Sequence, residues 1–370
     1  FLADRCCTEG VGRSNSDPDA LLAYDIYVDL SEKWSPQERL TWHSHMPGAL
    51  ETTGPRVTDL HRKHRFGYEE PHTLCPTQAE AGLTAGETVH LILALLQQFR
   101  APSSKRFINV GAGKCNQHDP LHKVLTSPIG RGFRGLVMEF DEADLATCLQ
   151  TLQAASNELD IAPVLGVVDP TTAGKVIREA SKRHFGPADL VFHRWDLEVI
   201  AIDLDGCDCP VLESMLFVVA PKVVVLEIAF HIPPPFKFTL ECGPGSSDEW
   251  LQNYDVRYFN AASGCSLSYA VETLSRFGLN LFRLAQQDAI FVRDDVAQLF
   301  ERGMSGVRFP VDEFACYQQS RLWLQLPVDY VREWFFSENL TSSLKRLHAN
   351  LSYINRLYNR PDSDFFLEIR

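Results

Sequence analysis

The chain has 370 residues, of which 45% are hydrophobic and 22% are charged, proportions typical of a folded globular protein with a large core. Its formal net charge of −13 argues against nucleic acid or an anionic membrane as the main partner, because phosphate groups would be repelled. No apolar run approaches the length needed to cross a membrane.

The amino-terminal part and the cysteines say little about function. The first 85 residues carry scattered Pro, Gly and His with weak periodicity, so we expect residues 1–85 to form an extension or cap. Phe1 stands where a start methionine is expected, which suggests a processed product of a secretory or organellar compartment. Ten cysteines show neither zinc spacing nor a regular disulfide pattern, so they leave the compartment open.

Strand and helix patterns alternate from residue 86 to residue 296. Helices are predicted at 86–100, at 142–155, after Asp169-Pro170 and at 266–277. Apolar strands are predicted at 107–110, 135–140, 162–168, 199–202 and 223–228, followed by a hairpin of 279–285 and 289–293. Continuous apolar strands joined through helices indicate a parallel sheet buried on both faces. We therefore expect an α/β fold: a Rossmann-like, doubly wound, mostly parallel sheet of seven strands with an antiparallel edge hairpin.

A short glycine loop, Gly111-Ala112-Gly113, follows the first strand of this domain. Glycine lets backbone amides approach a ligand closely, and an acid at the end of the next strand, Glu139, can accept hydrogen bonds from both hydroxyls of a ribose. The sequence holds no Gly-x-x-x-x-Gly-Lys-Ser/Thr loop for ATP. It also lacks the glycine spacing that admits the pyrophosphate of a nicotinamide cofactor, which disfavours an oxidoreductase. These features suggest a nucleoside ligand without a pyrophosphate.

An acidic turn, Asp203-Leu204-Asp205-Gly206-Cys207-Asp208, follows the fourth strand. Open α/β sheets bind ligands at the carboxyl ends of their strands, so these acids are expected at the working edge of the domain. Asp203, Asp205 and Asp208 could hold a divalent cation, because hard cations prefer carboxylate oxygens. A calcium loop would need Glu at its twelfth position, which is missing, and we expect no metal site. Asp208 is expected instead to cap a helix opened by Pro210.

Two pairs near these motifs have plain structural interpretations. Cys207 and Cys209 are separated by one residue, which would strain a disulfide between them, so we expect buried thiols. His118 and His122 are spaced like a ligand pair, but a place at the start of an exposed helix explains them better.

The motifs occur in an order that resembles the class I S-adenosylmethionine-dependent methyltransferases. The matching segments are Asn109-Val110-Gly111-Ala112-Gly113, Glu139, Asp203-Leu204-Asp205-Gly206-Cys207-Asp208 and Val225-Leu226-Glu227. More narrowly, the chain resembles the FkbM-type methyltransferases, whose fourth strand ends in a similar acidic sequence and whose fifth strand ends in Glu. The resemblance covers roughly residues 86–296, the size of one domain.

The resemblance implies S-adenosylmethionine as the cofactor and methyl transfer to a hydroxyl of a small molecule or glycan. It also implies cofactor contacts from Asn109, Gly111, Gly113, Glu139 and Asp203. Methyl transfer is an in-line displacement that needs positioning and, for a hydroxyl acceptor, a base. The candidate catalytic residues are Asp203, Asp205 and His231.

The alternative function is a catalytically silent methyltransferase fold that serves as a structural subunit of a larger assembly. Asn109 and Cys115 depart from the family pattern and favour it. Residues 297–370 are expected to form a helical carboxy-terminal extension. Within 340–358 one apolar stripe consists of Leu340, Leu344, Leu347, Leu351, Ile354 and Tyr358. We expect this helix to dock on its own domain, although it could also bind a protein partner.

Overall fold

The computed structural model describes residues 83–155, 158–186, 195–204, 206–240, 242, 264–303, 308–320, 344–345, 347–348 and 365–369. The predicted amino-terminal extension lies outside the described residues except for its last three positions. Most of the residues predicted to form the carboxy-terminal helix lie outside them as well. No described helix is both long and apolar enough to cross a lipid bilayer.

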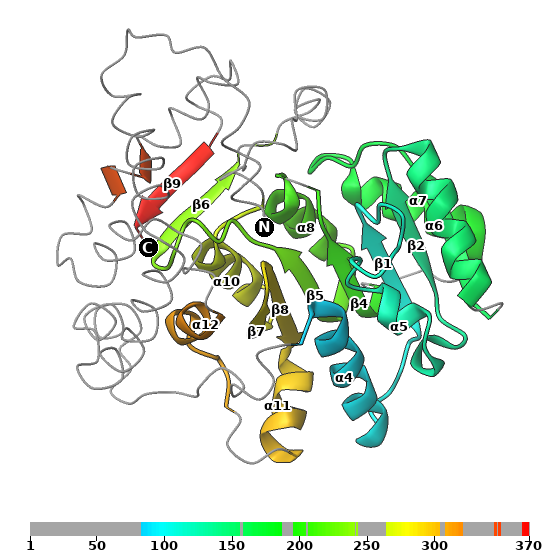
Figure 1. Cartoon of the computed structure of the whole chain (residues 1–370), viewed down its shortest axis with the longest axis horizontal. Helices are drawn as coiled ribbons and strands as arrows, with labels where there is room; N and C mark the ends of the chain where they lie inside the picture. Colours follow the sequence, from blue (N-terminus) through cyan, green and yellow to red (C-terminus); the bar gives the residue numbers. More distant parts are fainter. Residues whose placement is uncertain are drawn as a thin grey trace, which may run out of the picture.

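A seven-stranded sheet forms the centre of the described structure, with the strand order β3-β2-β1-β4-β5-β8-β7 (Figure 1). Its strands are β1 (Arg106–Val110), β2 (Arg134–Glu139), β3 (Asp160–Leu165), β4 (Trp195–Ile202), β5 (Val219–Glu227), β7 (Leu279–Ala285) and β8 (Asp288–Arg293). Strands β1 to β5 pair in parallel, whereas β8 pairs antiparallel with both β5 and β7. This arrangement confirms the predicted doubly wound sheet with an antiparallel edge hairpin.

Helices cover both faces of the sheet and make it the middle layer of three (Figure 1). One face packs against α4 (Ala85–Gln98), α5 (His122–Leu125), α6 (Glu142–Ala155) and α11 (Asp294–Gly303), and the other against α7 (Ala173–Phe185), α8 (Asp208–Leu216), α10 (Leu267–Ser275) and α12 (Glu313–Ser320). A short 3-10 helix, Pro128–Gly130, precedes β2. Successive strand residues point to opposite faces, so Phe107 belongs to one core and Ile108 to the other.

Helix α4 shows how local sequence sets an element. The Glu87 amide donates to the Thr84 hydroxyl at 3.2 Å, and the Thr84 amide donates to the Glu87 carboxylate at 3.0 Å. This reciprocal capping box satisfies two backbone donors at the start of the helix. Val89 and Ile92 lie on its buried face. The helix begins at Ala85, one residue before the predicted start.

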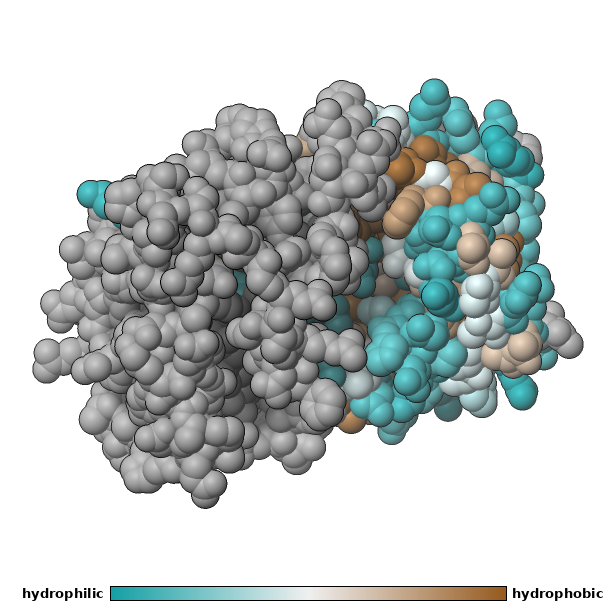
Figure 2. All heavy atoms as spheres, turned by 45° about the horizontal axis from the view of Figure 1, so that its top comes forward, coloured by the Kyte–Doolittle hydropathy of each residue, from teal (hydrophilic) through white to brown (hydrophobic). Residues whose placement is uncertain are grey.

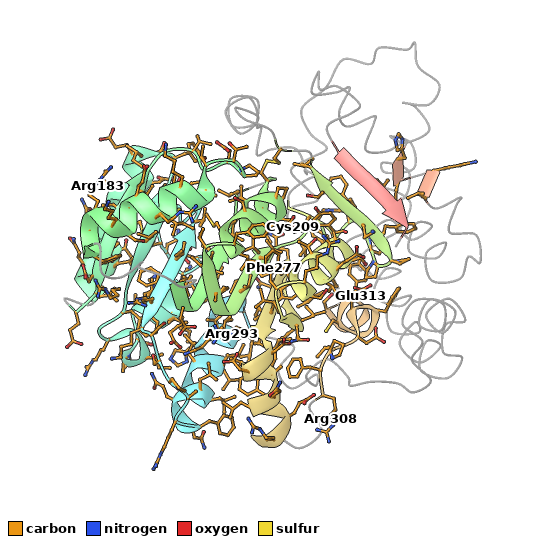
Figure 3. The ribbon with its side chains drawn as sticks, turned by 180° about the vertical axis from the view of Figure 1, so that it is seen from behind. Arg183, Cys209, Phe277, Arg293, Arg308 and Glu313 are labelled. Carbon is orange, nitrogen blue, oxygen red and sulfur yellow. A yellow bond between two sulfur atoms is a disulfide. The ribbon has the colours of Figure 1, made fainter. Side chains whose placement is uncertain are left out.

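Buried charges near the amino ends of β4 and β5 are paired. Lys222 Nζ lies 2.7 Å from Glu198 Oε1, and the two side chains are 5% and 4% exposed. The Ser104 amide donates a further hydrogen bond to the same Glu198 oxygen at 2.6 Å. Close by, Arg293 at the end of β8 (labelled in Figure 3) binds Asp196 at 2.7 Å. Each of these acids therefore has a cation beside it.

A second sheet of two antiparallel strands joins β6 (Phe236–Leu240) to β9 (Phe365–Ile369). It lies at the opposite end of the molecule from α6 and α7 (Figure 1). The prediction of helix for the carboxy-terminal extension missed β9. The run Phe-Phe-Leu-Glu-Ile suits a strand when another strand offers its edge, and such long-range pairing leaves little local signal.

The described part of the predicted apolar helix packs on the chain itself. Residues 344–345 and 347–348 are helical. Leu347 is 4% exposed, and Leu344 packs against the same core cluster. The other stripe residues lie outside the described part of the chain. The contacts of Leu344 and Leu347 favour docking on the same domain over a partner helix.

Three disulfides lie wholly within the described residues: Cys115–Cys148, Cys207–Cys242 and Cys209–Cys265. The expectation of free thiols at Cys207 and Cys209 is therefore wrong, although both residues are buried. Cys209 lies on α8 (Figure 3), and its partner lies just before α10. Connectivity depends on which elements the fold brings together, and spacing along the chain does not reveal it.

The face of the described part visible in Figure 2 is largely hydrophilic, with hydrophobic residues gathered in one area. The large apolar side chains exposed among the described residues are Leu91, Phe140, Leu165 and Phe217. Two of these, Phe140 and Leu165, lie where β2 and β3 end.

Candidate functional site

The glycine loop after β1 packs tightly against the end of β4. Gly111 has a φ of +67°, and a Cβ atom there would lie 1.7 Å from the backbone oxygen of Asp203. The Asp203 amide donates to the Val110 carbonyl at 3.1 Å, and the Gly111 amide donates to the Met138 carbonyl at 3.0 Å. Only glycine allows this approach. The glycine loop and Asp203 are therefore neighbours at the carboxyl edge of the sheet.

Glu139, at the end of β2, reaches across to the same loop. The Gly113 amide donates to Glu139 Oε2 at 2.7 Å, and the Phe140 and Asp141 amides donate to Oε1 at 2.9 and 3.1 Å. Glu139 is 5% exposed. A carboxylate has about four acceptor positions, so Glu139 keeps capacity for a ligand hydroxyl. A Cβ atom at Gly113 would meet no described atom within 4 Å, so among the described residues nothing packs against the loop at this point.

Two large apolar side chains border Glu139, and the sequence analysis missed them. Phe140 follows Glu139 directly and is 53% exposed, and Leu165 is 52% exposed. Leu165 pairs in register with Glu139 across β2 and β3. Phe140 carried a signal in the sequence, because it is a large apolar residue at the end of a predicted strand. Together they offer an apolar surface beside the carboxylate.

Asn109 positions an acid that the sequence analysis did not place in the site. Asn109 is 2% exposed, and its Nδ2 donates to Asp119 Oδ2 at 2.7 Å. The Leu121 amide donates to the other Asp119 oxygen at 2.7 Å. Burial raises the pKa of Asp119 to about 6, although these hydrogen bonds act in the opposite direction. An acid ten positions further along the chain therefore stands beside Asn109 in space.

The two histidines after the glycine loop have local contacts. His122 is the first residue of α5, and its Nδ1 lies 2.7 Å from the Cys115 carbonyl oxygen. His118 is exposed, and its amide donates to Asn116 Oδ1 at 2.9 Å. His122 therefore begins a helix as expected, whereas His118 lies in the turn that precedes it.

Asp208 organises the acidic turn. Its Oδ1 accepts from the Leu204 amide at 2.7 Å, and its Oδ2 accepts from the Gly206 amide at 2.9 Å. Helix α8 begins at Asp208 itself, so the expectation that Asp208 caps a helix opened by Pro210 is wrong. The side chain turns back because the two buried amides of the turn need an acceptor. Asp205 lies outside the described residues.

Three carboxylates converge at this edge. One oxygen each from Asp203, Asp208 and Glu227 lies within 4.8 Å of the others, with Asp208 and Glu227 buried and Asp203 exposed. Gln287 Nε2 donates to Glu227 Oε1 at 2.7 Å and helps to orient it. Hard divalent cations accept such oxygens. Glu227, which was not among the acids considered for a cation in the sequence, joins Asp203 and Asp208 here, and we assign no metal to the group.

Asp288 adds a further acid to this edge. It opens β8 and stands opposite Glu227 in the register with β5. Burial, together with the negative charges of Asp208 and Asp119, raises the pKa of Asp288 to about 7. In the sequence, Asp288 lies between the two strands predicted for the hairpin, and its position gave no sign of a place at this edge.

His231 lies in the loop after β5. Its ring packs on Phe230 with the ring centroids 3.8 Å apart, and Tyr317 donates to the Phe230 carbonyl at 2.6 Å. Burial lowers the pKa of His231 to about 3, so the ring is neutral at pH 7. A base with so low a pKa binds a proton weakly, which disfavours His231 as the base.

No family model and no curated protein matches the chain. Among solved structures, the carbon methyltransferase CurJ has 12% identity and a TM-score of 0.32, and the match covers 56% of this chain and 53% of CurJ. The magnesium protoporphyrin IX methyltransferase ChlM from Synechocystis PCC 6803, solved with bound SAH, has 10% identity and a TM-score of 0.30, covering 66% and 99%. A SAM-dependent methyltransferase from Geobacter sulfurreducens, solved with S-adenosyl-L-homocysteine, has 12% identity and a TM-score of 0.27, covering 85% and 98%. The match thus spans about half of the CurJ structure and nearly all of the other two structures.

Proposed function

We propose that the chain is an S-adenosylmethionine-dependent methyltransferase that acts on a hydroxyl oxygen of a small molecule or glycan. The observation that carries this proposal is the 2.7 Å contact between the Gly113 amide and the Glu139 carboxylate, at a point where no described atom lies within 4 Å of a Cβ placed on Gly113. A glycine loop joined to an acid at the carboxyl edge of a parallel sheet suits a ribose and the chain attached to it.

The residues around the loop fit the nucleoside half of this cofactor. Glu139 would accept hydrogen bonds from the ribose hydroxyls. Phe140 and Leu165 would supply an apolar surface for the adenine ring. Gly111 and Gly113 leave room for the backbone to approach the amino-acid portion.

Negative charge at the edge suits the other half of the cofactor, which carries an ammonium group and a sulfonium group. Asp119, held by Asn109, would face the ammonium group, and the acids near Asp203 would favour positive charge close to the loop. When bound, the cofactor supplies an electrophilic methyl group. The protein positions the acceptor and removes its proton.

We assign the role of base to Asp203. A hydroxyl must lose its proton as its oxygen is methylated, and a nearby carboxylate can accept it. Asp203 is the exposed member of the converging acids, whereas Asp208 is turned towards the backbone of its own turn. An exposed carboxylate can contact an acceptor that a buried one cannot.

The silent structural subunit is less well supported. It expects the side chains that depart from the family pattern to obstruct the loop. Cys115 instead points into the core, where it is bonded to Cys148. Lys114 is 58% exposed and lies 3.7 Å from Asp144 on α6. Leu347, from the helix that was to bind a partner, is buried in its own core.

Titration calorimetry with S-adenosylhomocysteine tests the proposal. Glu139→Ala should weaken binding by about 100-fold, the equivalent of two hydrogen bonds to a charged group. The matched control is Glu142→Ala, because Glu142 is an exposed acid three positions further on in the first turn of α6. A folded wild-type protein that does not bind at millimolar concentration would reject the proposal. Transfer of radiolabelled methyl to a panel of hydroxylated small molecules and glycans then tests the acceptor class.

A further inference from the structure

The segment that follows the glycine loop has an uncommon backbone shape. Gly111 and Gly113 have φ values of +67° and +50°, and Cys115 follows with a φ of +49°. A residue with a side chain is strained in this left-handed region, so contacts elsewhere must hold Cys115 in place. Cys115 is fully buried, and its carbonyl oxygen lies 2.7 Å from His122 Nδ1.

The Cys115–Cys148 disulfide joins the segment that follows the glycine loop to helix α6. Cys148 is a fully buried residue of α6, the helix that follows β2 and Glu139. The bond therefore ties the end of the glycine loop to the element that comes after the proposed ribose-binding acid.

Weaker contacts accompany this bond. The Gly113–Glu139 hydrogen bond joins the glycine loop to the end of β2, just before α6. The Lys114–Asp144 ion pair joins the loop to α6 itself, but it is exposed and adds little stability. The Asn109–Asp119 hydrogen bond lies within one segment and does not set its distance from α6. Among the described contacts between the segment after the glycine loop and α6, the disulfide is the one that is covalent.

We propose that the Cys115–Cys148 disulfide is a positioning element of the cofactor site, which holds the glycine loop against α6 in the conformation that binds S-adenosylmethionine. This inference rests on the proposed function and adds a condition to it, because the site is complete only in the oxidised protein. When the bond forms, the two thiols together give up two electrons and two protons. A protein disulfide of the compartment takes up these two electrons and two protons and becomes a dithiol. Such bonds persist in oxidising compartments, where we expect this chain to mature.

Without the bond, the loop would occupy its binding conformation for only part of the time. The apparent affinity for the cofactor falls by that fraction. We expect Cys115→Ala/Cys148→Ala to raise the dissociation constant of S-adenosylhomocysteine about tenfold, as for a binding conformation populated one-tenth of the time. The KM for S-adenosylmethionine should rise by a similar factor, with kcat retained at saturation.

The matched control is Cys209→Ala/Cys265→Ala. This pair closes a longer loop, with a separation of 56 residues against 33 for Cys115–Cys148, so its removal should lower the melting temperature at least as much. Its dissociation constant for S-adenosylhomocysteine should stay within about twofold of wild type, because it ties α8 to the start of α10. Equal affinity of the two double variants would overturn the inference. If the first variant does not fold, Cys115→Ala/Cys148→Val refills the buried space and replaces it.

Hydrogen exchange of the amides in 111–122 separates this inference from the proposed function. If wild type does not bind S-adenosylhomocysteine, the proposed function fails. Faster exchange in 111–122 for the first variant than for the control would then still support the positioning role. Unchanged exchange in this segment would overturn it.

Discussion

At the amino edge of the central sheet, acids are paired with bases, whereas at the carboxyl edge acids are gathered together. Glu198 lies 2.7 Å from Lys222, and Asp196 lies 2.7 Å from Arg293. A buried pair of opposite charges compensates part of the cost of removing both from water. The amino edge therefore keeps buried charge at a tolerable cost in stability.

The carboxyl edge brings several acids close to one another. Oxygens of Asp203, Asp208 and Glu227 lie within 4.8 Å of one another, and burial and neighbouring acids raise the pKa of Asp288 to about 7. Like charges in one place destabilise the folded state. The two edges thus differ in how their acids are arranged, and the acids gathered at the carboxyl edge are those to which we assign the proposed binding of a positively charged cofactor.

Breaking the paired edge should have the largest effect. Lys222→Met leaves the Glu198 carboxylate buried without its cation, and the free energy of unfolding should fall by about 3–5 kcal/mol. The double variant Lys222→Met/Glu198→Gln should regain most of that loss, because no uncompensated charge remains. Urea denaturation measures both. A loss below about 1 kcal/mol for the single variant would contradict the assigned role of the pair.

The close approach at the carboxyl edge should be the next most sensitive feature. Gly111→Ala places a Cβ atom 1.7 Å from the Asp203 carbonyl oxygen and should lower the free energy of unfolding by about 3 kcal/mol. Gly113→Ala is the control, because its φ is also positive but no described atom lies within 4 Å. It should cost about 1 kcal/mol. Similar losses of unfolding free energy for both variants would show that the close approach to Asp203 does not cause the effect of Gly111→Ala.

The acidic edge should make stability depend on pH. Burial, Asp208 and Asp119 raise the pKa of Asp288 from 3.8 in the unfolded chain to about 7, so the folded state binds the proton more tightly. Stability should therefore fall as the pH rises from about 4 to about 7.

Asp288→Asn removes this dependence. The full shift corresponds to about 4 kcal/mol, but Asp288 is only partly buried and water screens part of the effect, so the variant should be about 2 kcal/mol more stable than wild type at about pH 8 and nearly equal to it at about pH 4. Thermal unfolding at both pH values measures the effect. Equal stability of the two proteins at the higher pH would show that Asp288 is not penalised in the folded state.

The smallest effect is expected away from both edges. Lys175 and Glu179 form an i,i+4 pair on α7 at 3.9 Å, with side chains 73% and 60% exposed. Glu179→Gln should change the free energy of unfolding by less than about 0.5 kcal/mol, because water screens such pairs. A larger change in urea denaturation would mean that charge removal alone, without burial, accounts for part of the effects predicted above.

Features with a local or repeating signal could be predicted from the sequence. The apolar runs of β1, β4 and β5 indicated buried parallel strands, and the glycine loop and Glu139 indicated which strand ends lie at one edge. Features made by distant residues could not. The pairing of β6 with β9 and the hydrogen bond from Asn109 to Asp119 depend on which segments the finished fold brings together.

The same reason explains the misjudged part of the candidate site. Burial raises the pKa of Asp288, and the charges of Asp208 and Asp119, far away along the chain but near it in space, raise it further. Phe140 carried a local signal, but its exposure depends on the edge it borders. Spacing therefore predicts which residues reach the edge, and three-dimensional packing decides how charged and how accessible they are.

The spacing of Cys207 and Cys209 has a consequence for biosynthesis. Their partners, Cys242 and Cys265, leave the ribosome later, so neither native bond can form when the acidic turn is synthesised. Until then, each sulfur can react with earlier cysteines, and a crossed pairing of the four is chemically equivalent to the native one. Catalysed reshuffling by an isomerase would correct such errors within seconds to hours. Both native bonds at the acidic turn can therefore be complete only after Cys265 has been synthesised.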